Sequence, residues 1–210
     1  MEKFKKILKY LFAALGVLFV LYFFVLVYVG YNRYDDAKVA EQVQIIQDTH
    51  ITLDDVMGKY LPADPGAEAD KTIAGVDTNN NGIRDDVELA IFKEYPNSAK
   101  TRAVLLQYAL ALQMETMQPF LDEKNVVAVV IKENRADACV SDTLVPRETP
   151  ESWRTSEDVQ KIEKYVSFVE DKQFDTLERK KTRDDFFKKS GSYEVLRENV
   201  CDVNTAVLVN

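Results

Sequence analysis

The pattern of apolar and polar positions divides the chain into one long apolar run and several shorter amphipathic segments. No charged residue occurs from Tyr10 to Asn32, and most positions there are Leu, Val, Phe, Tyr or Ala. At about 1.5 Å per residue, a helix of this length crosses a hydrocarbon core about 30 Å thick. We therefore expect residues 1–34 to form a basic tail followed by a transmembrane helix.

Four lysines precede the apolar run, namely Lys3, Lys5, Lys6 and Lys9. By the positive-inside rule they place the N-terminus in the cytoplasm. A cleaved signal peptide is the alternative. The run is longer than the apolar part of a usual signal peptide, and no Ala-x-Ala site follows near residues 29–32. We favour an uncleaved signal-anchor, and cleavage stays an open question.

Beyond the run, apolar residues recur at spacings of four and three, so the helix is expected to continue to about Gln47; they are Val39, Val43 and Ile46. Thr52 followed by acidic residues is typical of a helix N-cap and predicts a short helix to Tyr60. Two prolines and a glycine within residues 61–66 then break any helix. Residues 35–75 are thus predicted to be a helical stalk and linker.

Residues 76–210 are predicted to form an all-α domain. Helical spacing continues up to Tyr95, and the segment from Ala99 to Met117 is apolar on most faces, as expected of a central core helix. The β-branched run from Val126 to Ile131 could be a strand or part of a helix. Residues 141–154 contain two prolines and are expected to be a loop. Helices are predicted from near Ser156 and around residues 174–187.

The charge of the domain excludes some classes of partner. Residues 35–210 contain 22 basic and 34 acidic side chains, a net charge of −12. Nucleic-acid-binding proteins are basic, and so are segments that dock on anionic lipid. The acidic balance fits a domain that attracts divalent cations, and equally one whose charge serves solubility alone.

The two cysteines, Cys139 and Cys201, both follow the apolar run. In an oxidising compartment such a pair is expected to form one disulfide. The chain has no Cys-x-x-Cys motif, so neither a zinc site nor a redox enzyme is supported.

The stretch from Asp77 to Glu88 carries the clearest candidate chemistry. Its oxygen-bearing side chains and its glycine fall at the ligand and turn positions of a twelve-residue calcium loop of the EF-hand type. Calcium is a hard cation that takes six to eight oxygen ligands. The expected ligands are the side chains of Asp77, Asn79 and Asn81, the backbone carbonyl of Ile83, Asp85 directly or through a water, and Glu88 through both oxygens.

Two features separate this loop from a standard EF-hand. Arg84 occupies position eight, where an aliphatic residue is usual, and Ile83 comes one place early. The prolines and glycines before the loop leave no room for an entering helix. An ordinary polar turn is the alternative, since Asn and Gly favour turns, but it would not require Asp77, Asp85 and Glu88 at metal spacing.

The loop resembles the dockerin-like and thrombospondin type 3 calcium repeats, whose entering segment is not a full helix. The order of features is similar to that of a loose group of bacterial exported proteins that pair a loop ending Gly-Ile-Arg-Asp-Asp-Val-Glu with helices. The matching stretches are residues 75–88, 95–108 and, more weakly, 177–191. The resemblance implies a calcium-loop helical domain outside the cytoplasm, and brings no activity with it.

Two functions follow as hypotheses. The first is a single-pass protein of the bacterial inner membrane whose calcium-stabilised periplasmic domain binds a protein or envelope partner. The second is a hydrolase of the envelope that depends on calcium or carboxylates. The chain has one histidine and neither a Gly-x-Ser-x-Gly nor a His-Glu-x-x-His motif, so we assign no catalytic residue.

Overall fold

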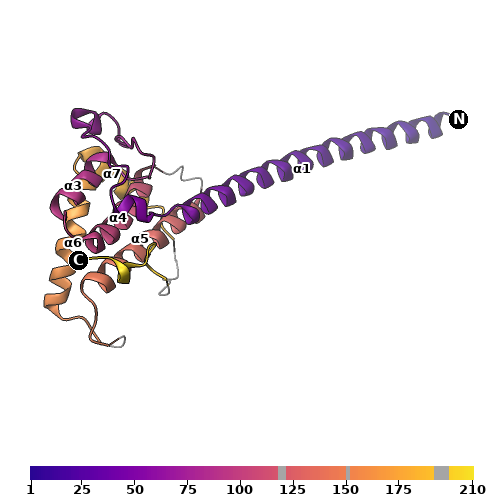
Figure 1. The fold of residues 1–210 in the computed structure, drawn as a ribbon. Coiled ribbons are helices and arrows are strands. Elements are labelled where there is room, and N and C mark those ends of the chain that lie inside the picture. The colour runs from indigo at the N-terminus through magenta and orange to yellow at the C-terminus, as the bar shows by residue number, and fades with distance from the viewer. Residues whose placement is uncertain (118–121, 150–151, 192–198) are drawn as a thin grey trace. The chain divides into compact units, whose positions relative to one another are not determined.

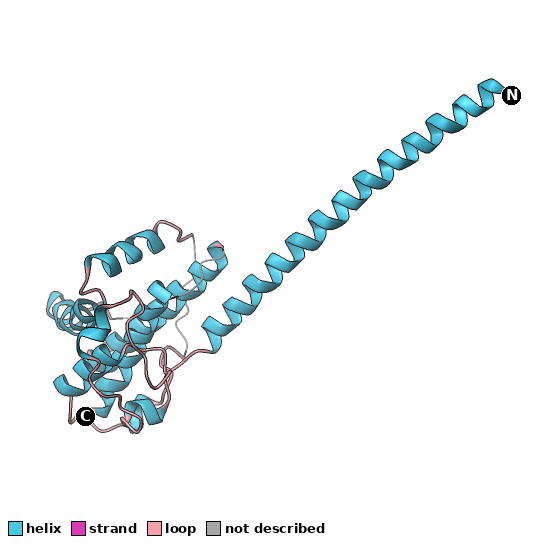
Figure 2. Cartoon of the chain, turned by 90° about the horizontal axis from the view of Figure 1, so that it is seen from above, coloured by secondary structure: helices cyan, strands magenta, loops and turns pink. Residues whose placement is uncertain are grey.

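The computed structural model describes residues 1–117, 122–149, 152–191 and 199–210. The regular secondary structure in these residues is entirely helical (Figures 1 and 2). No strand occurs in these ranges, so the predicted all-α class is confirmed. The chain divides into two compact units, Met1–Glu41 and Gln42–Asn210. We call them the N-terminal unit and the helical unit.

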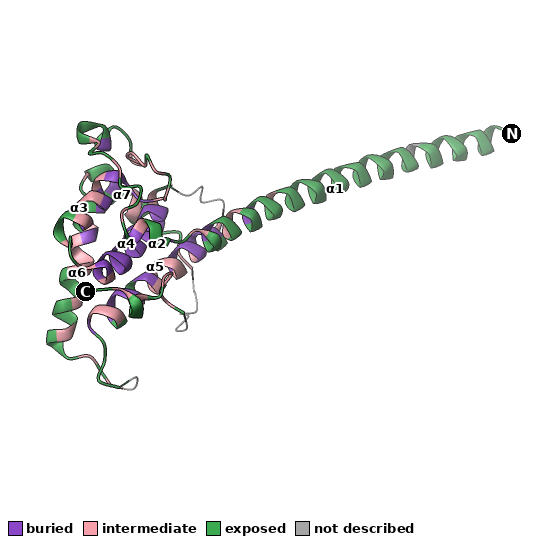
Figure 3. Cartoon of the chain, viewed as in Figure 1, coloured by how far each residue is buried: buried purple, intermediate pink, exposed green. Residues whose placement is uncertain are grey.

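Helix α1 (Glu2–Asp48) is continuous over 47 residues. From Phe4 to Tyr34 the described apolar residues of α1 are exposed on every side of the helix, as its colouring in Figure 3 shows, whereas Val39 is buried. Among the described residues, α1 alone is long and apolar enough to cross a membrane by length and composition. A helix that is apolar all round requires an apolar environment, because in water each exposed side chain is unfavourable.

The end of α1 belongs to the helical unit. Lys132 donates from Nζ to the carbonyl oxygens of Gln47 and Thr49, at 2.7 Å each, and so satisfies carbonyls that the helix itself leaves unpaired. Three apolar residues of this region are fully buried, namely Ile46, Ile51 and Val56. Residues 42–56, within the predicted stalk and linker, therefore contribute to the core.

Helix α4 (Ala99–Met117) is the centre of the helical unit. Every residue from Thr101 to Glu115 is buried, including the polar ones (Figure 3). It packs against α2 (Leu53–Val56), α3 (Asp85–Glu94), α5 (Glu123–Leu144), α6 (Ser156–Gln173) and α7 (Leu177–Phe187). The prediction of a central core helix is confirmed.

Side chains cap the surrounding helices. Thr52, Asp122 and Thr155 each form a reciprocal capping box with the residue three positions later. Helix α2 is shorter than predicted, because Gly58 has a φ of 67° that ends it before Tyr60. A Cβ at Gly58 would also lie 2.7 Å from the Phe92 ring.

The run from Val126 to Ile131 is helical and lies in α5. Its β-branched residues face the core, with Val126, Val129 and Val130 buried, and this burial outweighs their weak helix propensity. The loop predicted over residues 141–154 starts too early, because α5 continues to Leu144 before Val145 caps it.

Cys139 and Cys201 form the predicted disulfide, with a Cα–Cα distance of 5.0 Å. The bond joins α5 to the C-terminal segment, which contains the short 3₁₀ helix η2 (Thr205–Val207). Gln107 of α4 holds the same segment by donating to the Val200 carbonyl and accepting from the Asp202 N–H, at 2.8 Å each. The tail is thereby fixed against the core by both covalent and polar contacts.

A cluster of charged residues is buried between α4, α5, α6 and α7. Glu115 is fully buried, and its Oε2 lies 3.2 Å from Arg183 Nε. The angle is not that of a hydrogen bond, so among the described residues neither Glu115 oxygen has a hydrogen-bond partner. Arg183 also pairs with Glu170 at 2.6 Å and Glu133 at 3.6 Å. Burial, together with Glu133, raises the pKa of Glu115 to about 9.

We predict that Glu115→Gln flattens the pH dependence of stability. The folded pKa of about 9 lies above the ordinary value of 4.5, so between them the folded state binds one proton more than the unfolded state. The free energy of unfolding should fall as pH rises through this window, by at most about 1.4 kcal/mol per pH unit. Urea unfolding of the full chain in nonionic detergent at several pH values measures the slope.

Glu94→Gln at the exposed end of α3 is the matched control and should keep the wild-type slope. Equal slopes in wild type and Glu115→Gln would contradict the prediction.

Candidate metal centre

The loop from Asp77 to Glu88 runs into the first turn of α3, which begins at Asp85. No α-helix enters it. The preceding segment contains only the 3₁₀ helix η1 (Gly66–Asp70), as the prolines and glycines predicted. Gly82 at position six has a φ of 84°, and a Cβ there would lie 2.7 Å from Leu110 Cδ1. A side chain at this position would be strained by the positive φ, and the end of the Leu110 side chain would have to shift.

Side-chain oxygens hold the turn together. The Asp77 carboxylate accepts from the backbone N–H groups of Asn81 at 3.2 Å and Gly82 at 2.9 Å. Asn79 Oδ1 accepts from the Asn81 N–H at 3.3 Å, and Asn81 Oδ1 accepts from the Ile83 N–H at 2.9 Å. The three side chains thus each fold back on the loop's own backbone.

Glu88 joins the two asparagines. Its side chain is buried, with the residue 1% exposed, and its two oxygens accept from Asn79 Nδ2 at 3.1 Å and Asn81 Nδ2 at 3.2 Å. Burial, with smaller contributions from the neighbouring acids Asp55 and Asp85, raises the pKa of Glu88 to about 7. Burial also raises the pKa of Asp77. The loop holds two carboxyls whose ionised form is disfavoured by burial.

Asp85 and Ile83 have different structural roles in the loop. The Asp85 carboxylate accepts from the Thr78 N–H at 2.9 Å and the Thr78 hydroxyl at 2.6 Å, so it is turned toward Thr78. Ile83 is fully buried and anchors the loop to the core. No group of three or more His, Cys, Asp or Glu side chains in the described ranges is placed to hold a metal ion.

The donor chemistry nonetheless fits a hard cation. The side chains that converge carry carboxylate and amide oxygens, which calcium prefers. Asn79 and Asn81 now direct their NH2 groups at Glu88, and rotation about the soft terminal torsion of each side chain can direct the oxygen there instead. The loop therefore has the oxygens for a cation, while the folded arrangement satisfies them internally.

Arg84, at position eight of the loop, has a structural role that its place in the sequence does not indicate. Its side chain is 0% exposed and donates to Asp86 from Nε at 3.0 Å, to the Gln173 carbonyl at 3.0 Å, and to Asp175 at 3.3 Å. A Cβ on Gly75 would lie 2.8 Å from Arg84 Cδ. The arginine therefore connects the loop to the turn between α6 and α7.

Arg179 of α7 holds the segment that enters the loop. It is 1% exposed and pairs with Asp175 at 2.6 Å and with Asp70 at 2.8 Å. It also donates to the backbone carbonyls of Ala69, Thr72 and Ile73. Asp175 accepts from both buried arginines, so one carboxylate links the entering segment and the loop itself. We call Arg84, Asp175 and Arg179 the arginine clamp.

The only hint of the clamp in the sequence was Arg84 at a position where calcium loops usually have an aliphatic residue. Apart from Asp86, which is two residues away, its partners lie about 90 residues later and carry no motif. No protein-family model, curated protein or solved structure matches the chain.

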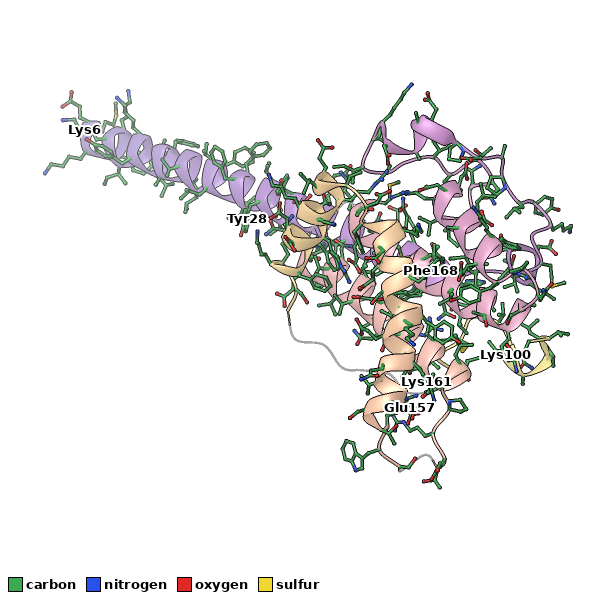
Figure 4. All side chains as sticks on the ribbon, turned by 90° about the vertical axis from the view of Figure 1, so that its left-hand side faces the viewer. Lys6, Tyr28, Lys100, Glu157, Lys161 and Phe168 are labelled. Atoms are coloured by element: carbon green, nitrogen blue, oxygen red, sulfur yellow. A yellow bond between two sulfur atoms is a disulfide. The ribbon has the colours of Figure 1, made fainter. Side chains whose placement is uncertain are left out.

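We predict that Arg84→Met lowers the free energy of unfolding by about 2–4 kcal/mol, because it removes a buried charge from partners that remain. Lys161→Ala is the matched control, since Lys161 pairs with Glu157 one turn away on the exposed face of α6 (Figure 4). That change should cost less than about 0.5 kcal/mol. Urea unfolding of the full-length variants measures both values, and equal losses would contradict a structural clamp.

Proposed function

We propose that the protein is a membrane-anchored module of the bacterial envelope whose helical unit uses calcium as a structural ion and binds a protein partner. The calcium proposal rests on the buried Glu88, which accepts hydrogen bonds from Asn79 and Asn81. The Asn81 N–H in turn donates to Asp77, so the predicted ligands are linked to one another. Partner binding rests on the anchor together with the lack of catalytic motifs.

Calcium would be held by Asp77, Asn79, Asn81, the Ile83 carbonyl and Glu88, with Asp85 reached through a water. The ion would supply positive charge beside Asp77 and Glu88, two carboxyls whose pKa burial raises. The loop brings three acidic residues against a divalent ion and lacks an entering helix. Weak binding follows, with a dissociation constant of about 10⁻⁴–10⁻³ M, typical of extracellular modules.

The anchor part rests on α1. Its apolar stretch is exposed along the N-terminal unit, Lys6 lies near its start, and Tyr28 lies near the end of the apolar run, where aromatic side chains favour the membrane interface (Figure 4). The lysines favour a cytoplasmic N-terminus, and this orientation places the helical unit in the periplasm. The disulfide is consistent with that oxidising compartment.

A calcium- or carboxylate-dependent hydrolase is the second candidate, favoured by a cleft beside the loop that is lined by several aspartates. Two of them already have structural partners. Asp55 accepts from the Thr52 N–H and hydroxyl in a capping box, and Asp54 pairs with Lys59. The single histidine, His50, is exposed and lies 2.6 Å from the Asp48 carbonyl oxygen. The partner-binding function is therefore preferred.

The first test is thermal unfolding of the full chain in nonionic detergent, with calcium and with a chelator. At a free calcium concentration about ten times the dissociation constant, linkage should add roughly 1.4 kcal/mol of stability. Glu88→Gln should abolish this gain, because it removes one of the charged ligands. Because it also loses one of the two acceptors for Asn79 and Asn81, its gain is measured against its own value in chelator. Asn80→Gly should keep the gain, since Asn80 is exposed, is no predicted ligand and has a φ of 57° that glycine also adopts. An unchanged melting temperature at millimolar calcium would leave the stretch an Asn-rich turn.

The second test concerns topology. Alkaline phosphatase, which needs an oxidising compartment, should be active when fused after Asn210, and a reporter that works only in the cytoplasm should be silent there. The mature chain should retain the lysine-rich tail by mass spectrometry. Cytoplasmic reporter activity, or a mature chain that starts near Asn32, would overturn the anchor.

A further inference from the structure

A cleft with a volume of about 930 Å³ lies in the helical unit between the loop, residues 48–60 and the second half of α4. Four aspartates from separate parts of the sequence line it, namely Asp48, Asp54, Asp55 and Asp77. No lysine or arginine is among the described residues that line it. We call it the acidic cleft, and its volume is at the upper end of the range for ligand-binding clefts.

The negative charge of the acidic cleft is mostly uncompensated. Within the described residues, Asp54 pairs with Lys59, whose amine is 2.7 Å away and outside the lining, and Asp48 attracts the Lys132 amine more weakly. The Asp55 carboxylate accepts from the Thr52 N–H at 2.7 Å and from the Thr52 hydroxyl at 2.6 Å, which orients the group without neutralising it. A ligand entering here therefore meets oriented carboxylates with a net negative charge.

The same cleft has an apolar side. Leu110, Met114 and Met117 of α4 line it, and Met117 is 49% exposed. Methionine side chains are unbranched and polarisable, so they adapt to apolar groups of different shapes. Carboxylates opposite an apolar strip form an amphipathic surface. A simple inorganic cation would contact the carboxylates but not the apolar strip.

We propose that the acidic cleft binds a segment of a partner protein that carries lysine or arginine next to aliphatic side chains. The cationic groups pair with Asp48, Asp54 and Asp55, and the aliphatic groups contact Met114 and Met117. The inference rests on the proposed partner-binding function and names the chemistry of the partner. Charge complementarity selects a cationic segment, and the apolar strip distinguishes a mixed segment from a purely basic one.

The test is fluorescence anisotropy with the full chain in nonionic detergent and a short fluorescein-labelled peptide of alternating lysine and leucine. We expect saturable binding that weakens as salt is added. Asp48→Asn and Asp54→Asn should each weaken binding by about two- to fivefold, as expected for exposed ion pairs. Asp171→Asn on α6 removes the same charge outside the cleft lining and should leave binding unchanged.

Two matched reagents separate the apolar contribution from the electrostatic one. Met117→Gln should weaken binding of the lysine–leucine peptide, but not of a lysine–serine peptide with the same charge. A glutamate–leucine peptide should not bind. Binding of the glutamate–leucine peptide, or an equal loss in Asp171→Asn and Asp48→Asn, would overturn the proposal.

Measurements in calcium and in chelator separate this inference from the metal claim. Saturable lysine–leucine binding with no calcium stabilisation would uphold the acidic cleft and reject the calcium site. Calcium stabilisation without saturable peptide binding would reject the acidic cleft alone.

Discussion

The arginine clamp is the interaction on which the loop depends. A calcium loop of the EF-hand type is normally held by a helix on each side, and here only the exit helix α3 is present. Arg84 and Arg179 replace the missing support by donating to backbone carbonyls and to the shared Asp175. Buried arginines are costly to desolvate, so they stabilise only where their donors are satisfied. Here most of these donors reach carbonyls or carboxylates.

The clamp also explains why the loop can present polar groups at the edge of a closed core. Ile83 and Arg84 are both fully buried next to one another, one among apolar side chains and one among polar partners. Gly82 lets the backbone approach Leu110 of α4. The residues between Asp77 and Asn81 are thereby left at the surface of the acidic cleft, against the most deeply buried helix of the unit.

The candidate metal centre and the acidic cleft share one wall, because Asp77, Asn79 and Asn81 belong to both. A cation in the loop and a cationic segment in the cleft would therefore act on the same backbone. Under the proposed function, the partner would bind this surface. An anchor in the membrane would hold such a surface at the envelope.

The sequence by itself determined most of the helices and where some of them begin. Apolar spacing predicted the core helix α4. Thr52 caps α2 as its residue type predicted, and the proline- and glycine-containing segment before the loop forms only a 3₁₀ helix. Local rules suffice there, because capping and backbone preference depend on neighbours in sequence. The disulfide was also predictable, since the chain offers only two cysteines.

Only the tertiary structure decided the rest. Val126 to Ile131 became helix because burial against the core outweighs propensity. Asp85 accepts two hydrogen bonds from Thr78, a contact that the ligand spacing does not indicate. The clamp joins residues about 90 positions apart, and the acidic cleft gathers aspartates from separate segments. Sequence spacing shows which groups are available, but burial and long-range packing determine the direction in which each one points.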